Sequence, residues 1–334
     1  LQIIMKLYLL NFYLIIFLFL SSCSLKNTKT HYSPNVSQKD EEREIYLQKQ
    51  ILINEMLSST KILHQISWPI LKNNRDICGQ QSSFSFGILY AVKKDLPKKD
   101  RKFFKKIFNK NVLPHYFKKY QVDNFPIIVS VAINSPAYDA DLQEGDIVLE
   151  INNLKVTEFR KKLRKTISIN PELSLKVLRN GEILEKIIKG IQVCNYNVQV
   201  IPSPAPNAFA DGEKVFITLA AVKLARTKDE LAFLIGHELA HNIYHFKFIK
   251  GSEANTLAIN YLDTPKLTSF SSFFLVSTQS KETEADLKGV EIAFKGGFLD
   301  EIHMAIANLN APEITVEKFL GFKLLSTTNK SPSF

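Results

Sequence analysis

The segment 236–242, which reads GHELAHN, constrains the fold more than any other part of the chain, and it continues the run 229–235. Because that run lacks Gly and Pro and contains several strong helix formers, it predicts one continuous helix. Residues four apart on a helix share a face, so His237 and His241 can both direct an imidazole at one metal ion. The chain must therefore fold around a helix that presents two histidines to a site.

Glu238 lies between the two histidines, and this H-E-x-x-H order is typical of zinc peptidases. Zinc binds imidazole nitrogens, and a catalytic zinc site keeps one position open for water. A carboxylate beside that water can take its proton as a general base. The alternative interpretation is a helix whose histidines merely face solvent or the core.

A third ligand is expected from the segment 281–289, KETEADLKG, which also has a helical pattern. Glu282 and Asp286 are four residues apart and share a face, whereas Glu284 points elsewhere. Glu282 supplies a carboxylate oxygen for the metal, and Asp286 is placed to hydrogen-bond a ligand imidazole and fix its tautomer. Alone, the segment would be read as a solvated acidic helix. Together with the histidines it predicts a site for one Zn²⁺ per chain.

GHELAHN followed by E-x-x-A-D resembles the HtpX, BepA and Oma-type gluzincins of peptidase family M48, over roughly residues 192–298. The resemblance implies an α+β fold with a gluzincin-type zincin catalytic domain. Many members also have a late H-P segment and a following Arg, where this chain has Ser331 and Pro332. His245 and His303 are further candidates near the site, although a surface or satisfied buried histidine is the ordinary interpretation of each.

The segment 207–212 (NAFADG) and the segment 214–219 (KVFITL) resemble the same family. In that family the strand after N-A-F is an edge strand along which the substrate pairs. Unpaired backbone groups on such an edge are a template for an extended peptide. The resemblance therefore implies a substrate-binding edge that includes Asn207, Val215 and Ile217.

A second resemblance precedes the catalytic segment. The string SPAYDADLQEGDIVLEINN at 135–153 is similar to the core of a PDZ domain, with Asp141 where that family usually has Gly. The segment 85–88 is a candidate for the loop that binds a ligand's terminal carboxylate, and Asn180-Gly181 predicts a hairpin turn. Such a domain adds a peptide as an extra strand. Alternatively, it only braces its neighbour.

The N-terminal part predicts one long amphipathic helix over 41–66, stopped by Pro69. The later segment 93–110 carries nine Lys and Arg among phenylalanines. Basic and aromatic residues of this kind suit nucleic acid or anionic lipid. No nucleic-acid motif accompanies them, so we expect a solvated helix face with an apolar seam, and no nucleic-acid partner.

The first residues predict export. The apolar run 7–20 is too short to span a bilayer and suits a signal peptide. The segment 20–23 (LSSC) resembles the bacterial lipobox, which implies a lipid on Cys23 and a membrane anchor. Ser24 beside it suggests the periplasmic face of the outer membrane, although a plain secretory signal or a short anchor is the alternative. The net charge of +10 suits an anionic membrane surface, or it reflects only a Lys-rich composition.

Export leaves an even pair of cysteines, Cys78 and Cys194, in a compartment where disulfides form. They bracket the PDZ-like segment, whose two chain ends are expected to lie near one another. We therefore expect a disulfide between them, the alternative being two unrelated buried thiols.

Four parts follow: a lipoprotein signal peptide at 1–22, a lipid tether and amphipathic helix at 23–77, a PDZ-like domain at 78–194 and a zinc metallopeptidase domain at 195–334. The predicted function is a zinc-dependent endopeptidase of the bacterial cell envelope that cleaves misfolded or stalled envelope proteins. Its partners would be polypeptide substrates and, through the lipid, a membrane. The alternative is a binding or chaperone-like lipoprotein whose zincin domain is degenerate.

Overall fold

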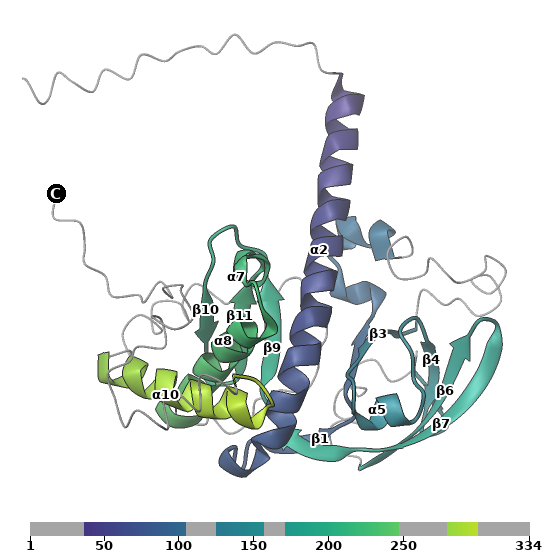
Figure 1. Cartoon of the computed structure of the whole chain (residues 1–334). Helices are drawn as coiled ribbons and strands as arrows, with labels where there is room; N and C mark the ends of the chain where they lie inside the picture. Colours follow the sequence, from purple (N-terminus) through teal and green to yellow (C-terminus); the bar gives the residue numbers. More distant parts are fainter. Residues whose placement is uncertain (1–36, 105–124, 157–170, 247–278, 300–334) are drawn as a thin grey trace, which may run out of the picture. The chain divides into compact units, whose positions relative to one another are not determined.

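The computed structural model describes residues 37–104, 125–156, 171–246 and 279–299 (Figure 1). The chain divides into two compact units, Leu1–Gln48 and Lys49–Phe334, and the contacts described below lie within the second. The predicted signal peptide, Cys23, His303 and the segment at Ser331 lie outside the described residues. Within the described ranges, none of the helices has the length and apolar character that crossing a membrane requires.

Helix α2 (Gln38–Asn73) buries one face, on which Met56, Leu63 and Ile70 recur at helical spacing. The prediction that Pro69 ends this helix is wrong, because α2 continues to Asn73. Proline removes one backbone hydrogen bond and strains the preceding turn. Ile70 directly after it is fully buried, however, and the Asn74 N–H donates to the Ile70 carbonyl at 3.2 Å. Tertiary packing of the last turn thus offsets the cost of the proline.

An antiparallel sheet forms the middle of the chain, with strands in the order β2-β3-β4-β6-β7. A short strand, β5, pairs with β4, and the four-residue helix α5 follows β3. The bounds of these elements are β2 (Ile88–Ala91), β3 (Ile127–Val131), α5 (Pro136–Asp139), β4 (Ile147–Ile151), β5 (Leu154–Lys155), β6 (Glu172–Arg179) and β7 (Glu182–Lys189). Strands β6 and β7 are joined by the two-residue turn Asn180-Gly181, in which both residues have positive φ, as a tight hairpin requires.

A buried ion pair braces this sheet. Asp146 is fully buried, and its carboxylate accepts two hydrogen bonds from Arg179, from Nε at 2.7 Å and from Nη2 at 2.8 Å. Asp141 has φ 55°, the left-handed region that glycine adopts most readily. Its carboxylate pairs with Arg179 and Lys186, each at 3.0 Å. Aspartate tolerates the conformation and here also binds two cations, so it can replace the glycine of the PDZ pattern.

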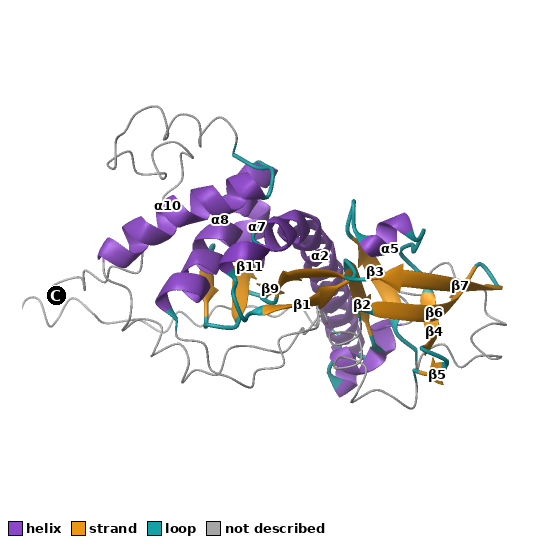
Figure 2. Cartoon of the chain, turned by 90° about the horizontal axis from the view of Figure 1, so that it is seen from below, coloured by secondary structure: helices purple, strands orange, loops and turns teal. Residues whose placement is uncertain are grey.

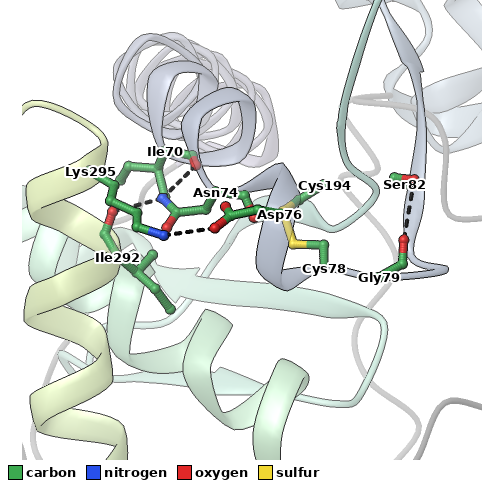
Figure 3. The surroundings of a disulfide bond; sticks show 9 residues. All are labelled: Ile70, Asn74, Asp76, Cys78, Gly79, Ser82, Cys194, Ile292 and Lys295. Carbon is green, nitrogen blue, oxygen red and sulfur yellow. Dashed lines mark hydrogen bonds and ion pairs between the residues drawn. A yellow bond between two sulfur atoms is a disulfide. The ribbon is translucent and has the colours of Figure 1, made fainter.

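Short strands and a disulfide lie where this sheet meets the rest of the chain. Strand β1 (Ser82–Ser85) pairs antiparallel with β8 (Ile191–Cys194), and Ser82 is opposite Cys194. A disulfide joins Cys78 to Cys194, with their Cα atoms 5.5 Å apart (Figure 3). The two ends of the segment that contains the PDZ-like sheet therefore lie next to each other.

Helix α2 and the residue after it contact both the sheet that lies between the two cysteines in sequence and the C-terminal part of the chain. His64 Nδ1 lies 2.9 Å from the hydroxyl oxygen of Ser130 on β3, and Gln65 Nε2 donates to the Val131 carbonyl at 2.8 Å. At the end of α2, Asn74 Nδ2 donates to the carbonyls of Ile70 and of Ile292, at 2.9 and 2.8 Å (Figure 3). Successive turns of one helix thus bind the PDZ-like sheet and then the C-terminal part of the chain.

The C-terminal part combines a three-stranded sheet with helices. Its elements are β9 (Asn197–Ile201), β10 (Ala208–Ala210), β11 (Lys214–Thr218), α7 (Leu219–Leu224), α8 (Lys228–Ala240), the π-helical turn η5 (His241–His245) and α10 (Gln279–Lys295). The strand order is β10-β11-β9, with β11 parallel to β9 and antiparallel to β10. Helices α8 and α10 lie side by side (Figure 2). The whole chain is thus a mixed α and β structure.

Only part of the basic segment 93–110 is described. It contains two single-turn 3-10 helices, η2 (Lys93–Asp95) and η3 (Lys98–Asp100), and the two phenylalanines Phe103 and Phe104 are fully buried. The two described phenylalanines of this segment therefore belong to the core.

Candidate metal centre

The start of α8 is fixed by a side-chain cap. The Thr227 hydroxyl oxygen accepts a hydrogen bond from the Glu230 N–H at 3.2 Å. The Glu230 carboxylate accepts from the N–H of Arg226 at 2.7 Å instead of from that of Thr227, so only half of a capping box forms. Beyond the cap, every residue from Leu231 to Ala240 is buried. This burial places the H-E-x-x-H residues inside the domain.

Two glycines allow α8 and α10 to approach very closely. A Cβ atom added to Gly236 would lie 2.4 Å from the Gly289 carbonyl oxygen. A Cβ added to Gly289 would lie 2.8 Å from the backbone nitrogen of His237. The helices therefore touch backbone to backbone next to the first histidine. This approach brings the carboxylates of α10 within reach of the histidines of α8.

Three side chains converge between these helices. His237 Nε2 lies 3.1 Å from His241 Nε2 and 3.3 Å from a Glu282 carboxylate oxygen, which is 3.5 Å from His241 Nε2. For bonds of about 2.0–2.1 Å in a tetrahedral zinc site, two ligand atoms lie roughly 3.3–3.4 Å apart. One face of such a tetrahedron therefore matches this triangle. In the described part of the chain these three residues form a cluster that could hold a metal ion.

Asp286 orients the first histidine. Its carboxylate lies 2.9 Å from His237 Nδ1, the nitrogen that faces away from the cluster. A carboxylate can only accept, so Nδ1 carries the proton and donates it. When the ring is neutral, this leaves the lone pair of Nε2 free to bind a metal.

The site carries a strongly negative field. Burial lowers the pKa of His237, but hydrogen bonds to Asp286 and Glu282 outweigh this effect and raise its pKa to about 10. For Glu282, burial raises the pKa, yet hydrogen bonds from His237 and His241 lower it to about 2. The negative carboxylates that stabilise a proton on His237 would also stabilise a divalent cation bound in place of that proton.

Glu238 differs from the other carboxylates of the site. It is buried, and burial raises its pKa above the ordinary value, although the neighbouring histidines oppose the shift. A raised pKa moves a carboxylate towards the range in which it both takes and returns a proton. This property suits Glu238 to a role as general base.

His245, one of the two further candidates from the sequence, lies beside the site. Its Nδ1 is 2.9 Å from His241 Nδ1, and its Nε2 is 3.1 Å from a Glu284 carboxylate oxygen. The ordinary interpretation of this histidine gave it no contact with a ligand. Its spacing of four residues from His241 was the signal in the sequence.

Asn242 is a second residue whose role the sequence did not reveal. It is buried, accepts a hydrogen bond from the Gly212 N–H at 2.6 Å and donates to the Lys214 carbonyl at 3.0 Å. These bonds tie the turn between β10 and β11 to the turn η5 that follows α8. A buried asparagine at the end of the GHELAHN motif was the available signal.

The predicted substrate edge requires a correction. Val215 and Ile217 lie on β11, which is paired on one side with β10 and on the other with β9. A strand paired on both sides has its ladder hydrogen bonds filled, so these residues cannot form an edge. Among the described strands the two edges of this sheet are β9 and β10, and β10 directly follows Asn207. The N-A-F strand itself, and not the strand after it, lies at the edge.

Comparison with known proteins agrees with both resemblances. The model of peptidase family M48 matches residues 179–250, and the model of a PDZ domain matches residues 117–189. The chain carries a PDZ domain followed by an M48-family peptidase domain. The M48 match includes His237, Glu238 and His241, whereas Glu282 and Asp286 come later in the chain and reach the site through the crossing of α8 and α10.

Other comparisons add less. No curated protein sequence matches this chain. Among solved structures, the crystal structure of the HtrA3 PDZ domain bound to a phage-derived ligand (FGRWV) is 24% identical, covering 25% of this chain and 78% of its own, with a TM-score of 0.19.

Proposed function

We propose that the M48 domain is a zinc-dependent endopeptidase that acts on unfolded or stalled proteins of the bacterial cell envelope. The observation that carries this proposal is the triangle of His237, His241 and Glu282, whose nitrogen and oxygen atoms have the spacing of tetrahedral zinc ligands. The family match supports a protease, and the donor set supports zinc.

The residues around the triangle have separate roles in this proposal. A zinc ion held there supplies Lewis-acid chemistry, lowering the pKa of a water towards neutrality and polarising a carbonyl group. Glu238 takes the proton of the attacking water on its carboxylate and returns it to the leaving amine. Asp286 keeps His237 in the tautomer that presents Nε2 to the metal.

Strand β10 is the proposed docking strand for the substrate. It lies at one end of the described sheet order and contacts α8, the helix that carries His237 and Glu238 and leads into His241. An extended polypeptide that adds to this edge would place its backbone beside the metal helix. The three-residue length of β10 limits the pairing to a short stretch, which suits unfolded substrates of varied sequence.

The PDZ domain is proposed to bind peptide segments of such substrates. PDZ domains accept a peptide as an added strand, and β2 is at the end of its sheet among the described strands. The segment 85–88 runs from the last residue of β1 to the first residue of β2, and Gly87 has φ 72° with Ser135 packed against it. Any side chain at Gly87 would collide with Ser135, so this position requires glycine.

The cell-envelope location is also a proposal, supported by the signal-like run and by the lipobox resemblance at Cys23. Mass spectrometry of the mature protein should find a diacylglyceryl group on Cys23, and Cys23→Ala should abolish it. An unmodified N-terminus beyond Cys23 would contradict the anchor.

The enzyme proposal is tested by measuring zinc content and cleavage of an unfolded protein. Glu282→Gln should lose zinc, because a neutral amide is a poorer oxygen donor than a carboxylate. Glu238→Gln should keep zinc and lose about 10²- to 10⁴-fold in rate, because the water has no base. Glu291→Gln, an exposed carboxylate on α10, is the control and should change neither. A wild-type protein that binds no zinc and cleaves nothing would instead favour a binding or chaperone-like role.

A further inference from the structure

A hydrogen-bonded chain leads from the second histidine ligand to the protein surface. His241 Nδ1 lies 2.9 Å from His245 Nδ1, and His245 Nε2 lies 3.1 Å from a carboxylate oxygen of Glu284. The His245 side chain is 6% exposed, whereas that of Glu284 is 53% exposed. Of His245 and Glu284, the buried residue, His245, is therefore the one that contacts the proposed metal ligand His241.

For neutral rings, one arrangement of protons satisfies every contact in this chain. The Glu284 carboxylate only accepts, so His245 carries its proton on Nε2 and donates it outward. A neutral His245 then has a lone pair on Nδ1, which accepts the Nδ1 proton of His241. His241 is left with a lone pair on Nε2, the atom that lies 3.1 Å from His237 Nε2 in the ligand triangle.

The contact lies within the π turn η5, in which the Phe246 N–H donates to the His241 carbonyl at 3.1 Å, an i to i+5 bond. Residues four apart on a helical turn share a face, so His241 faces His237 on one side and His245 on the other. The ring centroids of His241 and His245 are 5.0 Å apart, and those of His237 and His241 are 4.7 Å apart.

We propose that His245, held by Glu284, is a positioning residue that fixes the tautomer and the ring orientation of His241. The inference rests on the proposed zinc site and adds a support for its second ligand. His237 has its own support in Asp286, which contacts Nδ1 at the same distance of 2.9 Å. Each histidine ligand is therefore fixed from behind, one directly by a carboxylate and one through a second imidazole.

The test measures zinc affinity by competition with a chromophoric chelator. His245→Phe keeps a ring of similar size but has no acceptor, so affinity should fall about 10- to 100-fold. His245→Gln should restore part of the loss, because its amide oxygen can accept from His241. A residue that only fills space would show the reverse order. Thermal unfolding of the zinc-free variants should stay close to that of wild type, which separates positioning from folding.

A double-mutant cycle tests the role of Glu284. Glu284→Ala should weaken zinc binding less than His245→Phe, because water can reach this half-exposed position. If Glu284 acts through His245, the double variant should bind zinc no more weakly than His245→Phe alone. Glu291→Ala is the matched control, since it removes a similarly exposed, ion-paired carboxylate from the same helix, and should leave affinity unchanged.

The outcomes separate this inference from the proposed function. A wild-type protein without zinc affinity would overturn both. A wild-type protein that binds zinc and cleaves polypeptides, together with a His245→Phe variant of equal zinc affinity, would overturn the positioning role alone. Additive effects of His245→Phe and Glu284→Ala on zinc affinity would show that Glu284 does not act through His245, while the positioning role of His245 itself would stand.

Discussion

Gly289→Ala probes the helix crossing that assembles the metal centre. The added Cβ would lie 2.8 Å from the backbone nitrogen of His237 and 2.9 Å from its Cα. Ordinary van der Waals contact begins at 3.4 Å, so the two backbones must separate locally by about 0.6 Å. The contacting atoms are backbone atoms, and no flexible side chain can move aside.

The expected effect on stability is a balance of two terms. Alanine is favoured over glycine within a helix by about 1 kcal/mol. Overpacking costs about 1–3 kcal/mol. The zinc-free protein should therefore lose up to about 2 kcal/mol in the free energy of unfolding. Urea unfolding of the zinc-free form measures this term.

The effect on the metal should be larger. A shift of 0.6 Å would lengthen the 2.9 Å contact between Asp286 and His237 Nδ1 to about the limit of a hydrogen bond. Loss of such a support weakens metal binding about 10- to 100-fold. Chelator competition measures the loss, with Glu291→Ala on the exposed side of α10 as control. A Gly289→Ala protein that is more stable by about 1 kcal/mol and binds zinc normally would refute the reasoning.

Three further changes should act elsewhere in the chain. Arg179→Met removes the cation that pairs with the buried Asp146 carboxylate, so the free energy of unfolding, measured in urea, should fall by about 3–5 kcal/mol. An unchanged free energy of unfolding would show that Asp146 is not a buried charge. Burial lowers the pKa of His64 from 6.5 to about 4. Between pH 6.5 and pH 4 this histidine is therefore protonated in the unfolded chain but neutral in the folded chain. Stability should therefore fall by up to about 3 kcal/mol as the pH drops from 6.5 to 4, a slope that His64→Gln should reduce. Reduction of the disulfide between Cys78 and Cys194 opens a loop with a sequence separation of 116 and should cost about 4–5 kcal/mol, which unfolding with and without reductant measures.

The features that the sequence predicted well depend on short spacing along one element. Two histidines four apart on a helix share a face whatever surrounds them, and Asn180-Gly181 has the backbone freedom that a tight hairpin needs. The pairing of α8 with α10 could be expected only because zinc requires a third ligand. The two glycines that permit the crossing have no local signature.

The features that the sequence missed depend on tertiary context. Pro69 is an ordinary stop signal, but burial of Ile70 keeps the helix going. The contact of His245 with His241 could be expected from their spacing of four residues, but its outward partner Glu284 comes from another helix. The position of β11 between two strands depends on pairing with β9, which precedes it in the chain and runs parallel to it.

The disulfide has a consequence for how this chain can vary. Residues 79–193 are flanked by Cys78 and Cys194, whose Cα atoms are 5.5 Å apart and whose sulfur atoms are bonded (Figure 3), and β1 and β8 pair beside them. In topological terms the PDZ domain is an insertion, a cassette between α2 and the C-terminal part of the chain. A cassette with adjacent ends can be exchanged, lengthened or removed without stretching the chain on either side. If the PDZ domain binds peptides as proposed, selection for new specificities can act on the cassette while the geometry of α8 and α10 stays the same.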